Sequence, residues 1–173
     1  NVCANIDLNA AMEQHLESGA EITALCAAEN YAGPHHRYVT DEEGFVKQLL
    51  FDRSGEGEGV RALEGYIIAK ETLLDLMERC RAENLYRFHR DGILTWLREG
   101  GKMKLYVHQG YARTVRSVED YYEANKDMLC RELRSQLFPA DRPVRTRLHE
   151  GVSTYYGEDA ASVNSLVADN CII

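Results

Sequence analysis

The sequence predicts an α/β fold in which a mixed sheet packs against helices. Between residues 103 and 107, apolar side chains alternate with more polar ones, the period of a half-buried strand. Ser117 then stands three residues before Asp120, the spacing of a capping box, and predicts a helix that starts at Val118. Up to Leu137, the segments follow the order strand, helix, strand, hairpin, strand, two helices, strand and helix, which fits an α/β sheet.

The remaining elements follow from the same signals. Asp7 precedes a helical pattern at 8–16, and Gly19 is expected to end that helix. Strands are predicted at 21–28, 37–39, 45–51 and 61–69, and two further helices at 71–81 and 85–97. The residues expected to face the core from these two helices are Leu73, Leu74, Leu76, Met77, Phe88, Ile93, Leu94 and Trp96.

Two segments raise the possibility of a ligand loop. Residues 30–36 are predicted as a loop that ends in the adjacent pair His35 and His36. Two adjacent histidines cannot easily chelate one ion without further ligands, so a solvated turn is expected. Residues 53–59 are glycine-rich, but a phosphate cradle leads into a helix N-terminus and this segment carries two glutamates before a strand. We therefore interpret it as a flexible connection.

The texture of the sequence changes after Leu137. Residues 138–143 carry two of the three prolines, and 162–173 alternate short apolar pairs with small polar residues. Such alternation is typical of hexapeptide repeats, which stack as a parallel β-helix. One coil cannot bury its own face, so we expect the sequence to stop inside a second domain and to begin inside the first.

Composition limits the partners. The 173 residues carry a net charge of −8, which argues against a nucleic-acid or anionic-membrane partner because both need a basic face. The apolar runs are also too short for a membrane span. The five cysteines are scattered without a C-x-x-C pair, so we expect reduced thiols in a cytoplasmic protein and no zinc site.

Residues 113–125, which read RTVRSVEDYYEAN, carry a resemblance to a known family. Bacterial glucose-1-phosphate adenylyltransferases (ADP-glucose pyrophosphorylases) have a late strand ending in W-x-D-V-G-T and a helix opening L-x-x-Y-x-x-A-N. Residues 142–146 (RPVRT) resemble the family's linker, and 163–173 resemble its first β-helix coil. The likeness covers most of the chain and is strongest to the regulatory-type subunit, a paralogue found beside the catalytic one in many Firmicutes.

The resemblance implies a domain plan. Residues 1–138 correspond to the later part of a sugar-phosphate nucleotidyltransferase domain, with a Rossmann-like mixed sheet. Residues 139–161 are a linker, and 162–173 form the first coil of a left-handed parallel β-helix.

The family's catalytic positions are mostly replaced. Of its two metal-binding aspartates, one matches Asp7 and the other falls on Thr114, so Asp7 is a vestigial match only. By residue type alone, Asp7 is better explained as a helix N-cap. The lysine that holds the sugar phosphate falls on Asp52, and the glycine of the late strand falls on Arg116. No intact catalytic set is expected.

Part of the sugar-phosphate pocket is retained. The resemblance assigns Gly65, Phe88 and Asp91 to that pocket. Near these residues in the sequence, a serine of the family is replaced by Leu63. An aspartate and a lysine of the family are replaced by Arg87 and Arg90.

Three functions remain open. The first is a regulatory, non-catalytic subunit that assembles with a catalytic paralogue and responds to a small-molecule effector; it needs no cofactor, whereas active family members use Mg²⁺. The second is an active sugar-1-phosphate nucleotidyltransferase, which an intact upstream G-x-G-T-R-L-x-P-L-T loop would favour. The third is a hexapeptide-repeat acyltransferase, which needs more coils and a catalytic histidine; His149 is a poor candidate.

Overall fold

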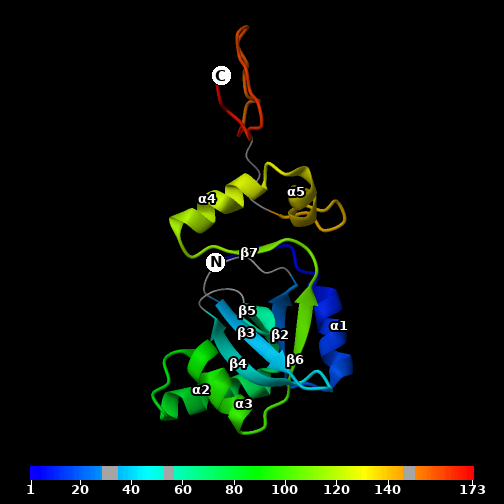
Figure 1. Ribbon diagram of the computed structural model, residues 1–173, viewed down its shortest axis with the longest axis vertical. Helices are drawn as coiled ribbons and strands as arrows, with labels where there is room; N and C mark the ends of the chain where they lie inside the picture. The colour runs from blue at the N-terminus through cyan, green and yellow to red at the C-terminus, as the bar shows by residue number, and fades with distance from the viewer. Residues whose placement is uncertain (29–34, 53–56, 146–150) are drawn as a thin grey trace. The chain divides into compact units, whose positions relative to one another are not determined.

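The computed structural model describes residues 1–28, 35–52, 57–145 and 151–173. The chain divides into two compact units, shown by the ribbon of Figure 1. The larger unit comprises residues 6–112, and the smaller unit comprises residues 1–5 together with 113–173.

The larger unit is built on a five-stranded mixed sheet with the strand order β4-β3-β5-β2-β6. Its strands are β2 (Ile22–Ala27), β3 (His35–Thr40), β4 (Val46–Asp52), β5 (Val60–Ile68) and β6 (Met103–His108). β2 and β6 are parallel, and the other described pairs are antiparallel. All six residues of β2 are buried, as a central strand requires. The predicted α/β sheet is confirmed.

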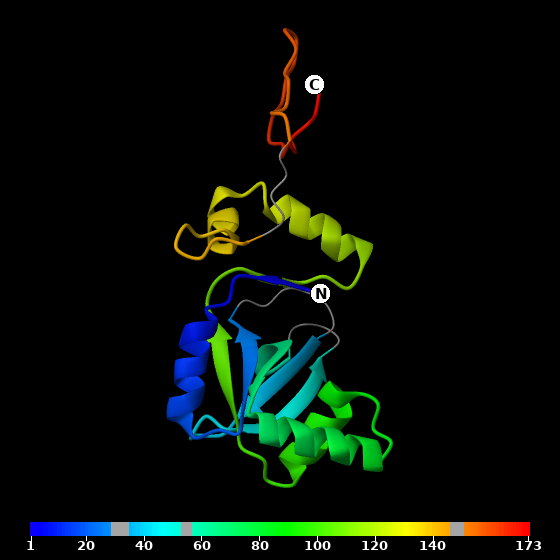
Figure 2. The same ribbon diagram turned by 180° about the vertical axis from the view of Figure 1, so that it is seen from behind.

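Helices contact both edge strands of this sheet. They are α1 (Leu8–Ser18), α2 (Lys70–Ala82), the π-helical turn η1 (Phe88–Gly92) and α3 (Ile93–Arg98). α1 contacts β2 and β6, α3 contacts β4, and α2 contacts η1, as Figure 1 and Figure 2 show from two sides. At the start of α1, Asp7 Oδ1 accepts hydrogen bonds from the amides of Asn9 and Ala10, at 3.1 and 3.0 Å. Gly19 ends the helix at φ 64°, as predicted.

The core of the larger unit lies between the sheet and these helices. It is formed by Ile22, Ala24, Cys26, Tyr38, Val46, Ala62, Leu76, Ile93, Trp96 and Met103. Two of the predicted core residues are wrong: Leu74 is 50% exposed and Met77 is 56% exposed. Because α2 packs mainly on η1, only a narrow stripe around Leu76 reaches the core.

The segment predicted as one helix over 85–97 differs in the structure. η1 begins only at Phe88, where the carbonyl accepts from the amide of Ile93, five residues on. A Cβ on Gly92 would lie 2.7 Å from Cys80 Sγ, so the glycine lets η1 approach α2 closely.

The predicted loop over 30–36 is also corrected at its end. His35 and His36 are the first residues of β3, where they pair with Asp52 and Phe51 of β4. His35 is only 4% exposed, so it is no solvated turn residue. The rest of that predicted loop, and residues 53–56 of the glycine-rich segment, lie outside the described residues.

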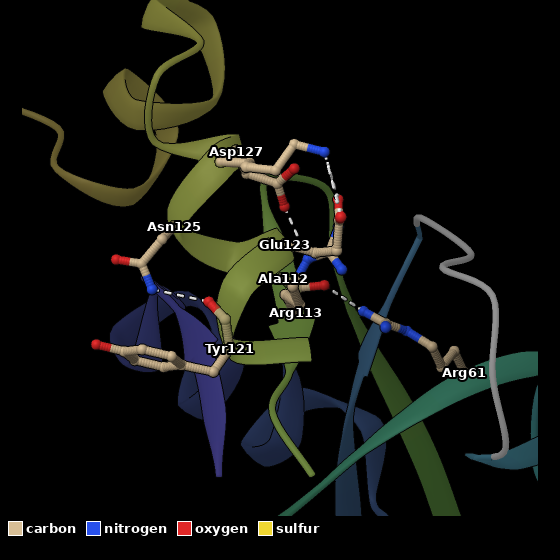
Figure 3. A network of polar contacts seen from close by, with 8 residues as sticks. Arg61, Ala112, Arg113, Tyr121, Glu123, Asn125 and Asp127 are labelled. Carbon is tan, nitrogen blue, oxygen red and sulfur yellow. Dashed lines mark hydrogen bonds and ion pairs between the residues drawn. The ribbon is translucent and has the colours of Figure 1, made fainter. Parts of the chain in front are cut away.

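The smaller unit joins the first residues of the chain to its later part. β1 (Val2–Ala4) pairs with β7 (Ala112–Thr114), and the helices α4 (Val118–Asp127) and α5 (Arg131–Leu137) follow. The predicted capping box at the start of α4 is confirmed, with Ser117 and Asp120 bonding each other's backbone amides. In Figure 3, Arg113 Nε donates to Asp127 Oδ2 at 2.7 Å and Asn125 Nδ2 donates to the Tyr121 carbonyl at 2.7 Å.

Residues 151–173 contain no helix. Within this segment, the backbones of Tyr155 and Ile172 form a parallel β-bridge. Around it, Tyr155 N donates to the Cys171 carbonyl at 2.9 Å, and Ile173 N donates to the Tyr155 carbonyl at 3.0 Å. Within the parts of the chain that the structure describes, no helix combines the length and apolar character needed to cross a bilayer.

Candidate functional site

A cavity of about 670 Å³ opens beside the sheet of the larger unit. Residues of β3, β4, β5, η1 and α3 line it: His36, Leu49, Phe51, Glu64, Arg87, His89, Arg90 and Leu94. The lining combines an apolar wall with two imidazoles, a carboxylate and two guanidinium groups. Such a mixture of apolar surface and convergent polar groups is typical of ligand pockets.

Two polar side chains of this cavity, Glu64 and His89, contact His36. Its Nδ1 lies 3.3 Å from Glu64 Oε1 and 3.1 Å from His89 Nε2. On the other side of its ring, His89 Nδ1 is hydrogen-bonded to the Tyr66 hydroxyl, which shares a 2.7 Å hydrogen bond with the Tyr38 hydroxyl. Burial raises the pKa of both tyrosines far above the ordinary value, so both hydroxyls stay protonated. The tyrosines therefore fix the ring of His89 without adding charge.

The position that matches the family's phosphate-binding lysine is built differently. Asp52 Oδ2 accepts from Arg37 Nε at 2.8 Å and from the amide of Gly57 at 2.8 Å. The side chains of Arg37 and Asp52 are only 2% and 9% exposed. Arg37 Nη1 also donates to the Gly59 carbonyl at 2.8 Å. Asp52 is thus the buried anion of an internal ion pair, and it presents no cation to a phosphate.

The positions of the family's metal-binding aspartates have structural roles here. Asp7 caps α1, as its residue type suggested, and Thr114 is the last residue of β7. Arg116, at the family's glycine position, donates its amide to Asp120 Oδ2 at 2.9 Å. That hydrogen bond is the main reason why the pKa of Asp120 is lowered. Asp7 and Arg116 thus support helix starts, and Thr114 ends a strand.

The three residues assigned to a sugar-phosphate pocket lie on two elements. Gly65 is on β5, whereas Phe88 and Asp91 belong to η1. Phe88 lines a second cavity of about 580 Å³ together with residues of α2. By contrast, Glu64 and Arg90, the chain neighbours of Gly65 and Asp91, line the first cavity. The assignment of these three residues to one pocket remains a prediction.

Sequence reasoning missed the cluster of His36, Glu64 and His89. The three residues are 28 and 25 positions apart in sequence (64 − 36 and 89 − 64), and no spacing motif links them. The pair His35-His36 is the available signal in the sequence, but adjacent histidines alone do not indicate a site because no further ligand stands near them in the chain. His149, considered above as an acyltransferase histidine, lies outside the described residues.

Comparisons with known proteins place this geometry in context. No protein-family model matches the chain. A glucose-1-phosphate adenylyltransferase of Clostridium botulinum (strain Eklund 17B / Type B) is 31% identical over 86 residues, which are 50% of this chain and 22% of the relative. One from Thermomicrobium roseum is 24% identical over 172 residues, which are 97% of this chain and 40% of the relative.

These comparisons confirm the resemblance to the glucose-1-phosphate adenylyltransferase family. Among the relatives is also the glycogen biosynthesis protein GlgD of Bacillus subtilis (strain 168), 27% identical over 115 residues, which are 65% of this chain and 32% of that protein. The chain spans 22% to 40% of the length of these three relatives.

Proposed function

We propose that the full-length protein containing this chain is a regulatory, non-catalytic subunit of glucose-1-phosphate adenylyltransferase in glycogen biosynthesis. It would assemble with a catalytic paralogue and alter the response of that subunit to a small-molecule effector. The observation that carries this proposal is the buried ion pair of Arg37 and Asp52. It stands where the resemblance calls for a lysine that holds the sugar phosphate.

The chemistry of nucleotidyl transfer explains why this matters. The reaction needs a metal clamp on the transferring phosphate and a positioned sugar phosphate. Asp52 brings a carboxylate to the place of a cation, and its negative charge is already neutralised inside the protein by Arg37. Asp7 is occupied as a helix cap, and Thr114 lacks a carboxylate for a second metal ligand. The proposed subunit therefore requires no Mg²⁺ of its own.

The fold proposed for the whole protein follows the family plan. The mixed sheet would be the later part of a nucleotidyltransferase domain, and the last residues would begin a left-handed β-helix. Tyr155 and Ile172 pair in parallel at a separation of 17 residues (172 − 155). A coil of three hexapeptides has about 18 residues, so parallel pairing at nearly this separation supports the proposal. Because Tyr155 lies in the segment expected to be a linker, the proposed coil would begin before residue 162.

The decisive assay measures pyrophosphate release from glucose-1-phosphate and ATP in the presence of Mg²⁺. We expect the full-length protein alone to release none, and we expect a catalytic paralogue to change its effector response when the protein is added. The paralogue alone is the control for assay conditions. Metal-dependent release by this protein alone, abolished by Asp7→Ala, would falsify the proposal.

An active nucleotidyltransferase is the second candidate, because the Clostridium botulinum and Thermomicrobium roseum relatives bear the name of the enzyme. The two candidates differ in the assay of the native protein alone. An inactive subunit releases no pyrophosphate, whereas an active enzyme releases it with a measurable KM for glucose-1-phosphate.

A further inference from the structure

We propose that His36, Glu64 and His89 form a binding site for one transition-metal ion of the zinc type. Their ligand atoms all lie within 4.8 Å of one another. In a tetrahedral zinc site with bonds of about 2.0–2.2 Å, neighbouring ligand atoms are about 3.3–3.6 Å apart. His36 Nδ1 lies 3.1 Å from His89 Nε2 and 3.3 Å from Glu64 Oε1, so small side-chain shifts suffice to hold an ion.

The backbone directs Glu64 into this cluster. The pairing of β2 with β5 passes from Leu25 opposite Gly65 to Cys26 opposite Ala62, which leaves two extra residues on β5. Glu64 is one of them and has φ 58°, a left-handed conformation that is unfavourable for a residue with a side chain. Bulges of this kind re-aim side chains, and strained residues concentrate at functional sites.

A second layer of residues orients His89. Tyr66 is hydrogen-bonded to His89 Nδ1, and Tyr38 is hydrogen-bonded to Tyr66. When Nδ1 carries the proton and donates it to the tyrosine oxygen, the lone pair of Nε2 points toward His36 and Glu64. Metal-binding histidines are generally held in this way through their second nitrogen.

The ligand set indicates the class of ion. Two imidazoles and one carboxylate suit zinc and similar transition metals, whereas Mg²⁺ prefers oxygen ligands and retained water. Three protein ligands leave a fourth position open, and the cluster lines the cavity of about 670 Å³. Arg87 and Arg90 line the same cavity, so the fourth position suits water or a small anion. The proposal is independent of the regulatory function proposed above.

The test uses the untagged full-length protein with Co²⁺ and Zn²⁺ as probes. We expect one equivalent of Co²⁺ to bind with the visible absorption of a tetrahedral site, and Zn²⁺ to displace it. Glu64→Gln and His89→Gln should each weaken binding at least about tenfold, the lower end of what is seen even for second-layer changes. Tyr66→Phe should weaken it by about 10–100-fold.

The matched control is His15→Gln, because His15 bonds Thr23 at 2.8 Å and lies outside the cluster. It should bind Co²⁺ as the native protein does. The Glu64 side chain is 42% exposed, so Glu64→Gln is expected to fold, which circular dichroism without metal can verify. The proposal is overturned if the native protein binds no stoichiometric metal, or if the folded Glu64→Gln variant binds it with unchanged affinity.

Discussion

At the scale of single residues, burial decides what each ionisable group can do. The pair Arg37–Asp52 is almost fully enclosed, whereas the pair Lys126–Glu123 is about half exposed on α4. Removing one partner of an enclosed pair leaves an uncompensated charge in the interior, but removing one partner of an exposed pair returns the other to water. Loss of one partner is therefore expected to lower the free energy of unfolding more at Arg37–Asp52 than at Lys126–Glu123.

Asp52→Asn should destabilise the larger unit strongly, because it leaves the guanidinium of Arg37 buried without its carboxylate. The expected loss in the free energy of unfolding is about 3–5 kcal/mol. Glu123→Gln, the control, should cost no more than about 0.5 kcal/mol. Urea unfolding followed by circular dichroism measures both, and equal effects of the two substitutions would show that the Arg37–Asp52 pair is open to water.

The thiols offer a second test at this scale. Burial raises the pKa of Cys26 to about 12, while Cys130 is exposed. Since the thiolate is the reactive form, Cys26 should resist alkylation at neutral pH until the protein unfolds. Cys130 should react in the native state. Mass spectrometry after iodoacetamide treatment, with and without urea, gives the order of labelling, and early labelling of Cys26 would contradict the described core.

At the scale of elements, local signals fixed some structures and tertiary contacts fixed others. The caps of α1 and α4 and the alternation in β6 lie within a few residues, so the sequence predicted these elements well. The close approach of η1 to α2 depends on Gly92, where a Cβ would meet Cys80 Sγ. Likewise, the bulge that presents Glu64 depends on the pairing of β5 with β2. Pairing between segments that are distant in sequence produces no periodic pattern of residues. The histidine cluster therefore could not be predicted from the sequence.

The capping box of α4 predicts a pH dependence. Backbone hydrogen bonds, first from Arg116, lower the pKa of Asp120 below its ordinary value of 3.8. A lowered folded-state pKa means that the stabilisation is present above the unfolded pKa and is lost as the pH falls through the folded value. Asp120→Asn should therefore lower stability at pH values near 7 and make less difference in acid.

Urea unfolding at neutral and at strongly acidic pH measures this difference. Ser117→Ala removes the other half of the box and should cost about 1 kcal/mol at neutral pH. Glu119→Gln, in the same turn but outside the box, is the control. A deficit of Asp120→Asn that grows on acidification would show that the sign of the pKa shift is wrong.

At the scale of the whole molecule, apolar side chains of residues 162–173 are exposed. Val163, Leu166 and Ile172 are 86%, 51% and 85% exposed. A single repeat coil needs neighbours to cover such residues, and unpaired strand edges invite pairing with another chain. In the present chain these side chains are available for contact with further coils of the same chain or with a second chain.

We expect the full-length protein to be an oligomer and the present chain, expressed alone, to self-associate. Sedimentation velocity at micromolar concentration distinguishes these states. Ile172→Asp should reduce self-association of the chain by placing a charge on the exposed surface. A stable monomer that unfolds cooperatively would mean that residues 162–173 are not an incomplete repeat.

In the smaller unit, residues 1–5 are hydrogen-bonded to a later segment of the chain. Asn5 Nδ2 donates to the carbonyls of Leu137 and Arg142, both at 2.9 Å, and Val115 N donates to the Asn1 carbonyl at 2.7 Å. During synthesis, residues 6–112 therefore emerge and can fold while residues 1–5 still wait for a partner segment that has not been made. The order of translation thus lets residues 6–112 fold before residues 1–5 meet the later segment that they bind.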